Sequence, residues 1–179
     1  LKPEAYETAI IFLDHPGLGW HGRTTTGIER TEPSAGLNLY FLQALQAIRE
    51  LSQWTGEDAE ESLTCEIDGL CERLRNQFYC PRTGLIADAL DTKGKPSGYS
   101  QIVNSLAVIT GVLKGDVARR AMLSICDLEQ HPWVAQGTPY TYFSVVEALG
   151  RLGMESLALR EFRARWVPMI EDGATTTWE

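Results

Sequence analysis

Aromatic rings and carboxylates gather in, or just after, the long segments that the sequence predicts to lie between helices. These residues are His15, His21, His131, Trp20, Trp133, Trp178, Tyr99, Tyr140, Tyr142, Asp14, Glu29, Glu32, Asp88, Asp91, Asp172 and Glu179. A pyranose has an apolar face that stacks on an aromatic ring, and its hydroxyls donate hydrogen bonds to carboxylates. The pattern favours carbohydrate binding. A solvated surface over buried tryptophans is the alternative interpretation.

Six stretches with the apolar spacing of amphipathic helices must position these groups. They cover residues 37–54, 58–79, 99–113, 116–129, 140–152 and 155–170, and no strand alternation stands out. The first, third and fifth stretches carry few charges, whereas the second, fourth and sixth are rich in them. Because helices that are apolar all round are buried, we expect three inner helices covered by three outer ones.

The connections alternate in length in the same rhythm. Each inner stretch passes to the next outer one through a tight link, at Thr55-Gly56, Lys114-Gly115 or Gly153-Met154. The long segments are residues 13–34, 80–98, 130–139 and 171 onward. Short links make antiparallel neighbours, and long structureless loops in compact domains are usually functional. We therefore expect the long segments to meet at the start of the inner helices and to form the site there.

Composition excludes several classes of protein. The 179 residues, 44% hydrophobic and 22% charged, predict one globular domain over residues 1–179, with no apolar run long enough to span a membrane. A formal charge of −8 without a basic stripe argues against a nucleic-acid partner. The spacing of Cys65, Cys71, Cys80 and Cys126 fits no zinc motif, so we expect no metal and reduced, buried thiols. Together with the lack of a recognisable signal peptide, this weakly favours a cytoplasmic protein.

Three blocks of the sequence resemble the catalytic domain of α-L-rhamnosidases, glycoside hydrolase family 78. They are FLDHPGLGW near the start, TGLIADAL followed by GYSQIVNSLAVITGVL, and GTPYTYFSVVEALGRLGMESLALREFRARWVPMIEDGATTTWE at the end. The last block, with its closing GATTTWE, is the most specific. The resemblance implies an all-α fold of helical hairpins, the (α/α)6 toroid of the six-hairpin glycosidases, of which this chain supplies about three hairpins.

The resemblance also implies an inverting mechanism, with two carboxylates about 6.5–9.5 Å apart and no cofactor. The general base of the family matches Glu179. Position 15 is His where Trp is commoner in the family, and Trp20 is placed to take over its stacking role. Tyr99 and Gln101 begin the third helix within reach of sugar hydroxyls, although packing is the more usual role of such a tyrosine. The predicted sugar-binding residues are Trp178, Trp20, Asp14, His15, Tyr99, Trp133 and Tyr140.

The general acid that the resemblance requires has no clear match, because the acidic motif that carries it in the family is not found here. Glu29 and Glu32 are local candidates, and helix capping is their alternative role. We therefore expect a piece of a rhamnoside hydrolase that is inactive alone and that self-associates through the flanks of an incomplete barrel. A six-hairpin glycosidase for another sugar, or a non-catalytic helical scaffold, remains as an alternative. The unequal starts of the inner stretches, at 37, 99 and 140, disfavour a regular repeat.

Overall fold

The computed structural model describes residues 33–56 and 60–176, in which six helices form three antiparallel hairpins. The bounds of the helices lie within four residues of the predicted ones, and the predicted all-α class is confirmed. The helices are α1 (Ala35–Thr55), α2 (Glu60–Phe78), α3 (Gln101–Ile109), α4 (Gly115–Cys126), α5 (Phe143–Arg151) and α6 (Glu155–Glu171). Among them, none is both long and apolar enough to cross a membrane.

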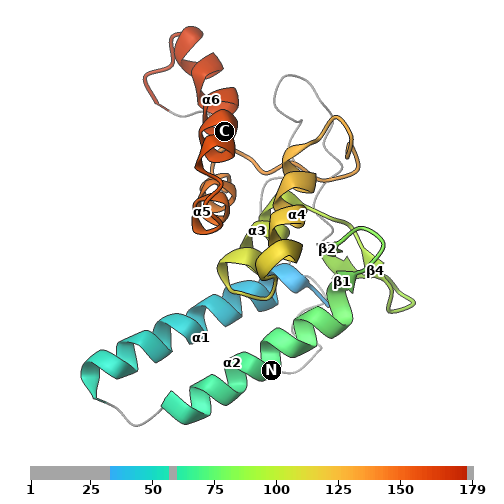
Figure 1. The fold of residues 1–179 in the computed structure, drawn as a ribbon, viewed down its shortest axis with the longest axis vertical. Helices are drawn as coiled ribbons and strands as arrows, with labels where there is room; N and C mark the ends of the chain where they lie inside the picture. The colour runs from blue at the N-terminus through green and yellow to red at the C-terminus, as the bar shows by residue number, and fades with distance from the viewer. Residues whose placement is uncertain (1–32, 57–59, 177–179) are drawn as a thin grey trace, which may run out of the picture.

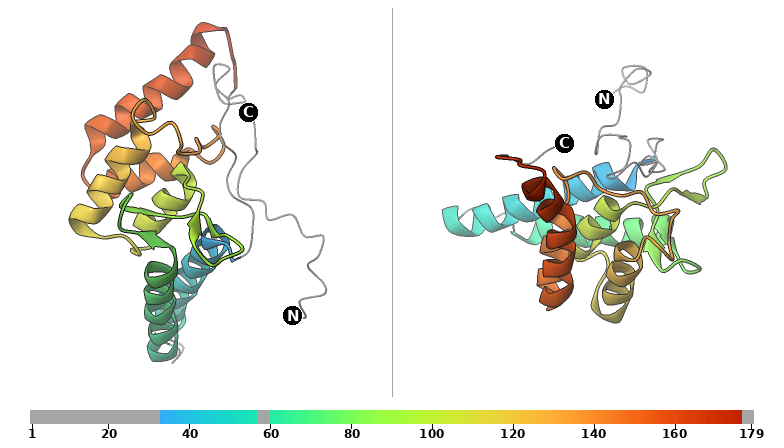
Figure 2. Two further views of the ribbon diagram at one scale, coloured as in Figure 1. Left: turned by 90° about the vertical axis from the view of Figure 1, so that its right-hand side faces the viewer. Right: turned by 90° about the horizontal axis from the view of Figure 1, so that it is seen from above.

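The inner layer consists of α1, α3 and α5. Helix α3 contacts α1 and α5, and each of the outer helices α2, α4 and α6 packs against the inner helix that precedes it. The hairpins therefore form a row, with α1 and α2 at one end, α5 and α6 at the other, and α3 and α4 between them (Figures 1 and 2). Helix α3 is buried over its whole length, as predicted for an inner helix with neighbours on all sides.

A glycine with positive φ stands at the tight link of each hairpin, as the sequence indicated. Gly56 (φ 72°) ends α1, and Gly153 (φ 66°) lies between α5 and α6. Gly115 (φ 57°) opens α4. Residues with a Cβ reach this left-handed region only at a cost, so glycine is the residue that lets each chain reversal stay short.

The sequence predicts no regular structure in the long segment between α2 and α3, and this prediction is wrong. It holds two antiparallel pairs of two-residue strands. β1 (Tyr79–Cys80) pairs with β2 (Leu85–Ile86), and β3 (Ala89–Leu90) pairs with β4 (Pro96–Ser97). Strands this short have no alternating pattern to detect, which is why the sequence did not reveal them.

The two end hairpins depart from the predicted inner and outer layers. Helix α1 buries Leu39 and Leu42 but leaves Phe41 and Ile48 half exposed, so its expected burial all round is wrong. Helix α6, expected to be an ordinary outer helix, buries Glu161 and Arg165 and exposes Leu159, Phe162 and Ile170. Apolar side chains stay exposed in the described structure on the flanks that have no neighbouring hairpin.

Candidate functional site at the N-terminal ends of the inner helices

Two of the four long segments, 80–98 and 130–139, meet at the start of the inner helices α1 and α3, as predicted. Residues 13–32 and 177–179 of the other two segments lie outside the described residues, and the place of those segments stays a prediction. The backbone N–H of Ala35, the first residue of α1, donates to the carbonyl of Asp88 over 2.8 Å. The N–H of Gln101, the first residue of α3, donates to the carbonyl of Ala135 over 2.9 Å, and the N–H of Ala135 donates to the carbonyl of Tyr99. These bonds bring segments 80–98 and 130–139 to one end of the inner layer.

Asp88 is buried beside the N-terminus of α3. Its Oδ1 accepts a hydrogen bond of 2.7 Å from the hydroxyl of Ser100, and the same hydroxyl accepts from the N–H of Val103 to cap the helix. Neither side chain is more than 1% exposed. A carboxylate at a helix N-terminus is stabilised by the partial positive charge there, so this pair fixes where α3 begins.

Asn104, one turn into α3, holds the second strand in place. Its side-chain oxygen accepts from the N–H of Ile86 over 2.9 Å, and its amide nitrogen donates to the carbonyl of Ile86 over 3.0 Å. The carboxamide therefore satisfies both backbone groups of a buried residue, as a neighbouring strand would. This contact ties β2 to the most buried helix of the fold.

Gln101 has a structural role, which corrects the prediction that it reaches sugar hydroxyls. Its side chain is fully buried, and its Nε2 donates to the carbonyl of Ile125 at the end of α4. Its Oε1 accepts from the N–H of Gly137 over 2.9 Å and from Arg165 over 3.4 Å. The carboxamide thus joins α3, α4, α6 and the segment before α5.

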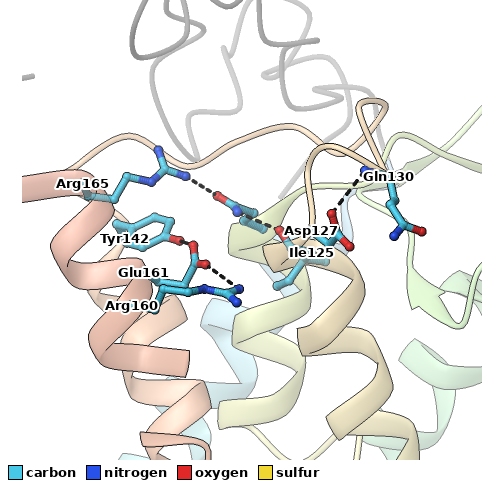
Figure 3. Close-up of polar contacts among 8 residues, drawn as sticks. Ile125, Asp127, Gln130, Tyr142, Arg160, Glu161 and Arg165 are labelled. Carbon is cyan, nitrogen blue, oxygen red and sulfur yellow. Dashed lines mark hydrogen bonds and ion pairs between the residues drawn. The ribbon is translucent and has the colours of Figure 1, made fainter. Parts of the chain in front are cut away.

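A buried polar network links α5 to α6 and was not predicted from the sequence (Figure 3). The Tyr142 hydroxyl donates to Glu161 Oε2 over 2.7 Å, and Arg160 lies 3.2 Å from Glu161 Oε1. The guanidinium of Arg165 stacks 4.2 Å from the centre of the Tyr142 ring, and the side-chain oxygen of Gln136 accepts from it. Burial, and then the nearby Glu161 carboxylate, raise the pKa of Tyr142 well above its usual range, so it stays a neutral donor.

The spacing of the buried residues on α6 was the signal for this network. Glu161 and Arg165 lie in one stripe with Ala158 and Met169, and the charges of the helix hid that stripe among those of an outer face. A cleft of about 1310 Å³ between α4 and α6 exposes parts of the network, with Cys126 and Glu129 also lining it.

Two of the predicted sugar-binding aromatics lie together. The rings of Tyr99 and Trp133 meet edge to face with centroids 5.3 Å apart, and the centroids of the His131 and Trp133 rings lie 5.5 Å apart, again edge to face. Trp133 is 40% exposed and Tyr99 is partly buried against the core. Tyr140, on the turn before α5, is 66% exposed. Trp133 and Tyr140 therefore present ring surface to solvent, while the contacts of Tyr99 favour its packing role.

Cys80, on β1, contacts Tyr99 of this cluster. A hydrogen bond with the Tyr99 hydroxyl is the main cause that lowers the pKa of the Cys80 thiol, to about 7. All four cysteines are free; Cys71 is buried as predicted, but Cys65 is exposed, contrary to the prediction. Within the described residues, no three His, Cys, Asp or Glu side chains gather closely enough to hold a metal ion.

The remaining predicted site residues lie outside the described residues. These are Asp14, His15, Trp20, Trp178, the candidate acids Glu29 and Glu32, and the predicted base Glu179. The described structure ends at residue 176, five residues after the last residue of α6. In the sequence, Trp178 and Glu179 follow shortly after that point.

The described fold defines a class of protein, a row of helical hairpins whose long segments gather at the start of the inner helices. Solved structures share this fold, among them two rhamnosidases. A family 78 rhamnosidase of Bacillus sp. GL1 matches with a TM-score of 0.71 and 22% identity, over 89% of this chain and 16% of that chain. A rhamnosidase from Klebsiella oxytoca with rhamnose bound matches with a TM-score of 0.70 and 21% identity, over 81% of this chain and 27% of that chain.

These matches confirm that the fold resembles the one found in family 78 rhamnosidases, as the sequence blocks predicted. The chain spans less than a third of the length of either structure. No protein-family model matches the chain, and no curated protein sequence matches it.

Proposed function

We propose that the chain forms part of the catalytic domain of a glycoside hydrolase that releases terminal α-L-rhamnose by inversion. The observation that carries the proposal is the fold shared with the two rhamnosidases over most of the chain. The closing GATTTWE of the sequence supports it, because that block carries the residue that matches the family's base. One of the two similar structures has rhamnose bound, which favours this sugar over the alternatives.

In this mechanism Glu179 is the general base. It takes a proton from a water molecule, which attacks the anomeric carbon while a carboxylic acid on the opposite side protonates the leaving oxygen. Trp178 lies next to the base in sequence and shapes the sugar site, with Trp133 and Tyr140 as exposed parts of the aromatic wall. Rings of this kind stack on the apolar face of a pyranose.

The buried network supplies the rigidity that such a site needs. Glu161 and Arg165 on α6 are tied to Tyr142 at the start of α5 and to Gln136 in the segment before it. Helix α6 is therefore fixed against the segment that carries Tyr140. Because catalytic groups must be held close to their productive geometry, a fixed α6 supports the placement of the segment that follows it.

Inversion needs two carboxylates, and the sequence offers a family match for one. The 179-residue chain is therefore expected to bind the sugar weakly and not to turn it over. The measurement is release of 4-nitrophenol from 4-nitrophenyl α-L-rhamnopyranoside, with Glu179→Gln as the matched variant. Turnover that is lost in Glu179→Gln would show that the acid also lies within the chain and that the piece is competent.

Binding tests the choice of sugar separately. Saturation-transfer NMR is run with L-rhamnose, D-glucose, D-mannose and D-glucuronate. We expect saturation transfer to L-rhamnose, and we expect Trp178→Ala to remove it. Trp54→Ala should leave the transfer unchanged, because Trp54 is 82% exposed near the end of α1. A stronger signal with another sugar favours a different six-hairpin glycosidase, and no signal with any of them favours a non-catalytic scaffold.

A further inference from the structure

We propose that two copies of this chain form a two-fold dimer. In each of its two equal contacts, the exposed apolar side of α6 in one copy packs against the exposed apolar side of α1 in the other. The inference is independent of the sugar and of catalysis. Helices α1 and α6 lie at opposite ends of the row of hairpins (Figure 2). Each of them leaves a stripe of apolar side chains exposed in the described structure.

The first stripe, called here the α1 edge, follows one side of α1. It consists of Leu37, Phe41, Ile48 and Leu51, which are 41%, 51%, 50% and 54% exposed. Their separations of four, seven and three residues place them on one face of a helix. The opposite face, with Leu39 and Leu42 fully buried, packs on the rest of the fold.

The second stripe, the α6 edge, consists of Leu159, Phe162, Trp166 and Ile170. Separations of three, four and four residues again place them on one helix face. Leu159, Phe162 and Ile170 are 58%, 48% and 68% exposed, and the Phe162 and Trp166 rings stack with centroids 4.5 Å apart. Arg160 and Ala164 line the cleft toward α4 from the other side of the helix. The α6 edge therefore faces away from the row.

The packing inside the row shows what such an edge contacts. Helix α4, the outer helix of the second hairpin, packs on its own inner helix α3 and also on α5, the inner helix of the next hairpin. By the same step, α6 would pack on the inner helix that begins a following hairpin. In a second copy of the chain, α1 is the inner helix at the other end of the described row. The two edges are therefore complementary in position as well as in chemistry.

The apolar area that each edge can bury determines how many contacts the dimer needs. Each edge offers roughly 400 Å² of apolar surface, taking about 200 Å² for a fully exposed large side chain. A stable interface needs about 800 Å² per partner, so one edge-to-edge contact is too small and two contacts together reach that size. A two-fold pair makes both contacts at once, and the second forms within an existing complex.

Net charge opposes the pairing and provides a diagnostic. Each copy carries a formal charge of −8. Because salt screens the repulsion between two such copies and does not weaken apolar burial, added sodium chloride should tighten the pair. An association driven by ion pairs would weaken instead.

Sedimentation velocity over a concentration series tests the proposal. We expect the unmodified chain to form a dimer, and Phe41→Glu or Ile170→Glu to weaken it by about tenfold or more, since either change places a charge in both contacts of the pair. Leu123→Glu is the matched control, because Leu123 on α4 is 52% exposed and belongs to neither edge. Circular dichroism and a thermal melt of each variant verify that these surface changes leave the fold intact.

Cross-linking tests which edges meet. In a background with Cys65→Ser and Cys80→Ser, a Phe41→Cys chain is mixed with a Phe162→Cys chain and treated with a short bis-maleimide. The proposal expects the mixed product to far exceed the product of either chain alone. A chain that stays monomeric at all concentrations overturns the proposal. So does a dimer that survives both glutamate variants, or one that cross-links α1 only to α1.

Discussion

The hydroxyl of Tyr142 donates a 2.7 Å hydrogen bond to Glu161, and this contact joins the start of α5 to the middle of α6 inside the protein. Both side chains are buried, and Arg160 provides a second contact to the carboxylate from the solvent side. A carboxylate that is taken out of water keeps its charge only where donors replace the water, so the stability of the third hairpin depends on this bond.

Removing that donor should destabilise the fold. Tyr142→Phe leaves the Glu161 carboxylate buried with one partner fewer, and we expect the free energy of unfolding to fall by about 1–2 kcal/mol. Urea denaturation followed by circular dichroism, at one protein concentration, measures the change. Tyr140→Phe is the control, because Tyr140 is 66% exposed and its loss of a hydroxyl should cost less than about 0.5 kcal/mol. Equal effects of the two changes would contradict the role given to the Tyr142 hydroxyl.

Asn104 should be among the most sensitive polar positions. Asn104→Ala leaves both backbone groups of the buried Ile86 without their partner, and each unsatisfied group costs about 1–3 kcal/mol, so a loss of about 2–6 kcal/mol is expected. Asn38→Ala is the comparison, since Asn38 donates one bond to the carbonyl of Ser34 at the edge of α1. A loss of no more than about 1 kcal/mol is expected there. The prediction is wrong if Asn104→Ala costs no more than Asn38→Ala in the same urea titration.

Two glycines of the third hairpin should respond in opposite directions to the same substitution. Gly153 has φ of 66°, so Gly153→Ala should destabilise by about 1–2 kcal/mol. Gly150 lies within α5, and a Cβ built there meets nothing within 4 Å. Gly150→Ala should therefore stabilise the fold by about 0.5–1 kcal/mol, because alanine loses less backbone entropy in a helix. If both substitutions moved the midpoint of thermal unfolding in the same direction, the left-handed conformation of Gly153 would be refuted.

Cys80 should react with alkylating agents at neutral pH. Its thiol pKa is lowered to about 7, first by the hydrogen bond with Tyr99, so the thiolate is half populated near pH 7. Tyr99→Phe removes that bond and should move the midpoint of the pH–rate profile up toward 9, the ordinary value for a thiol. The folded protein is treated with iodoacetamide at each pH and then digested, and mass spectrometry of the peptides gives the rate of alkylation. Cys126, whose pKa burial raises to about 12, should stay unmodified across this range. An unchanged midpoint in Tyr99→Phe would show that the bond does not control the thiol.

The hairpins could be predicted from the sequence because local signals determine them. The apolar period of each stretch and a glycine near each tight link are enough to place α1 to α6 and their order. The convergence of the long segments followed from the alternation of short and long connections. The apolar period of a helix does not say which of its faces remain without a neighbour. The expectation of free flanks comes from the resemblance to a six-hairpin fold, of which this chain supplies about three hairpins.

The polar interior could not be predicted for a different reason. Glu161 and Arg165 are charged residues on a charge-rich helix. Their spacing with Ala158 and Met169 is a weak signal of burial, but it does not identify the partners Tyr142, Gln136 and Gln101. Likewise, Asn104 looks like a polar interruption of an apolar helix until the backbone of Ile86 is placed beside it. Partners that lie 18 to 64 residues apart in the sequence leave no local pattern.

The short and the long connections of the hairpins differ in how much sequence change they allow. At one end, a short turn through a left-handed glycine allows few other sequences, as at Gly56 and Gly153. At the other, the chain returns through long segments whose anchors are a few buried bonds, such as those of Asp88 and Gln101. Substitutions between those anchors leave these bonds in place, so the helices should tolerate them. A scaffold of this kind can change the ligand it recognises while its hairpins stay the same.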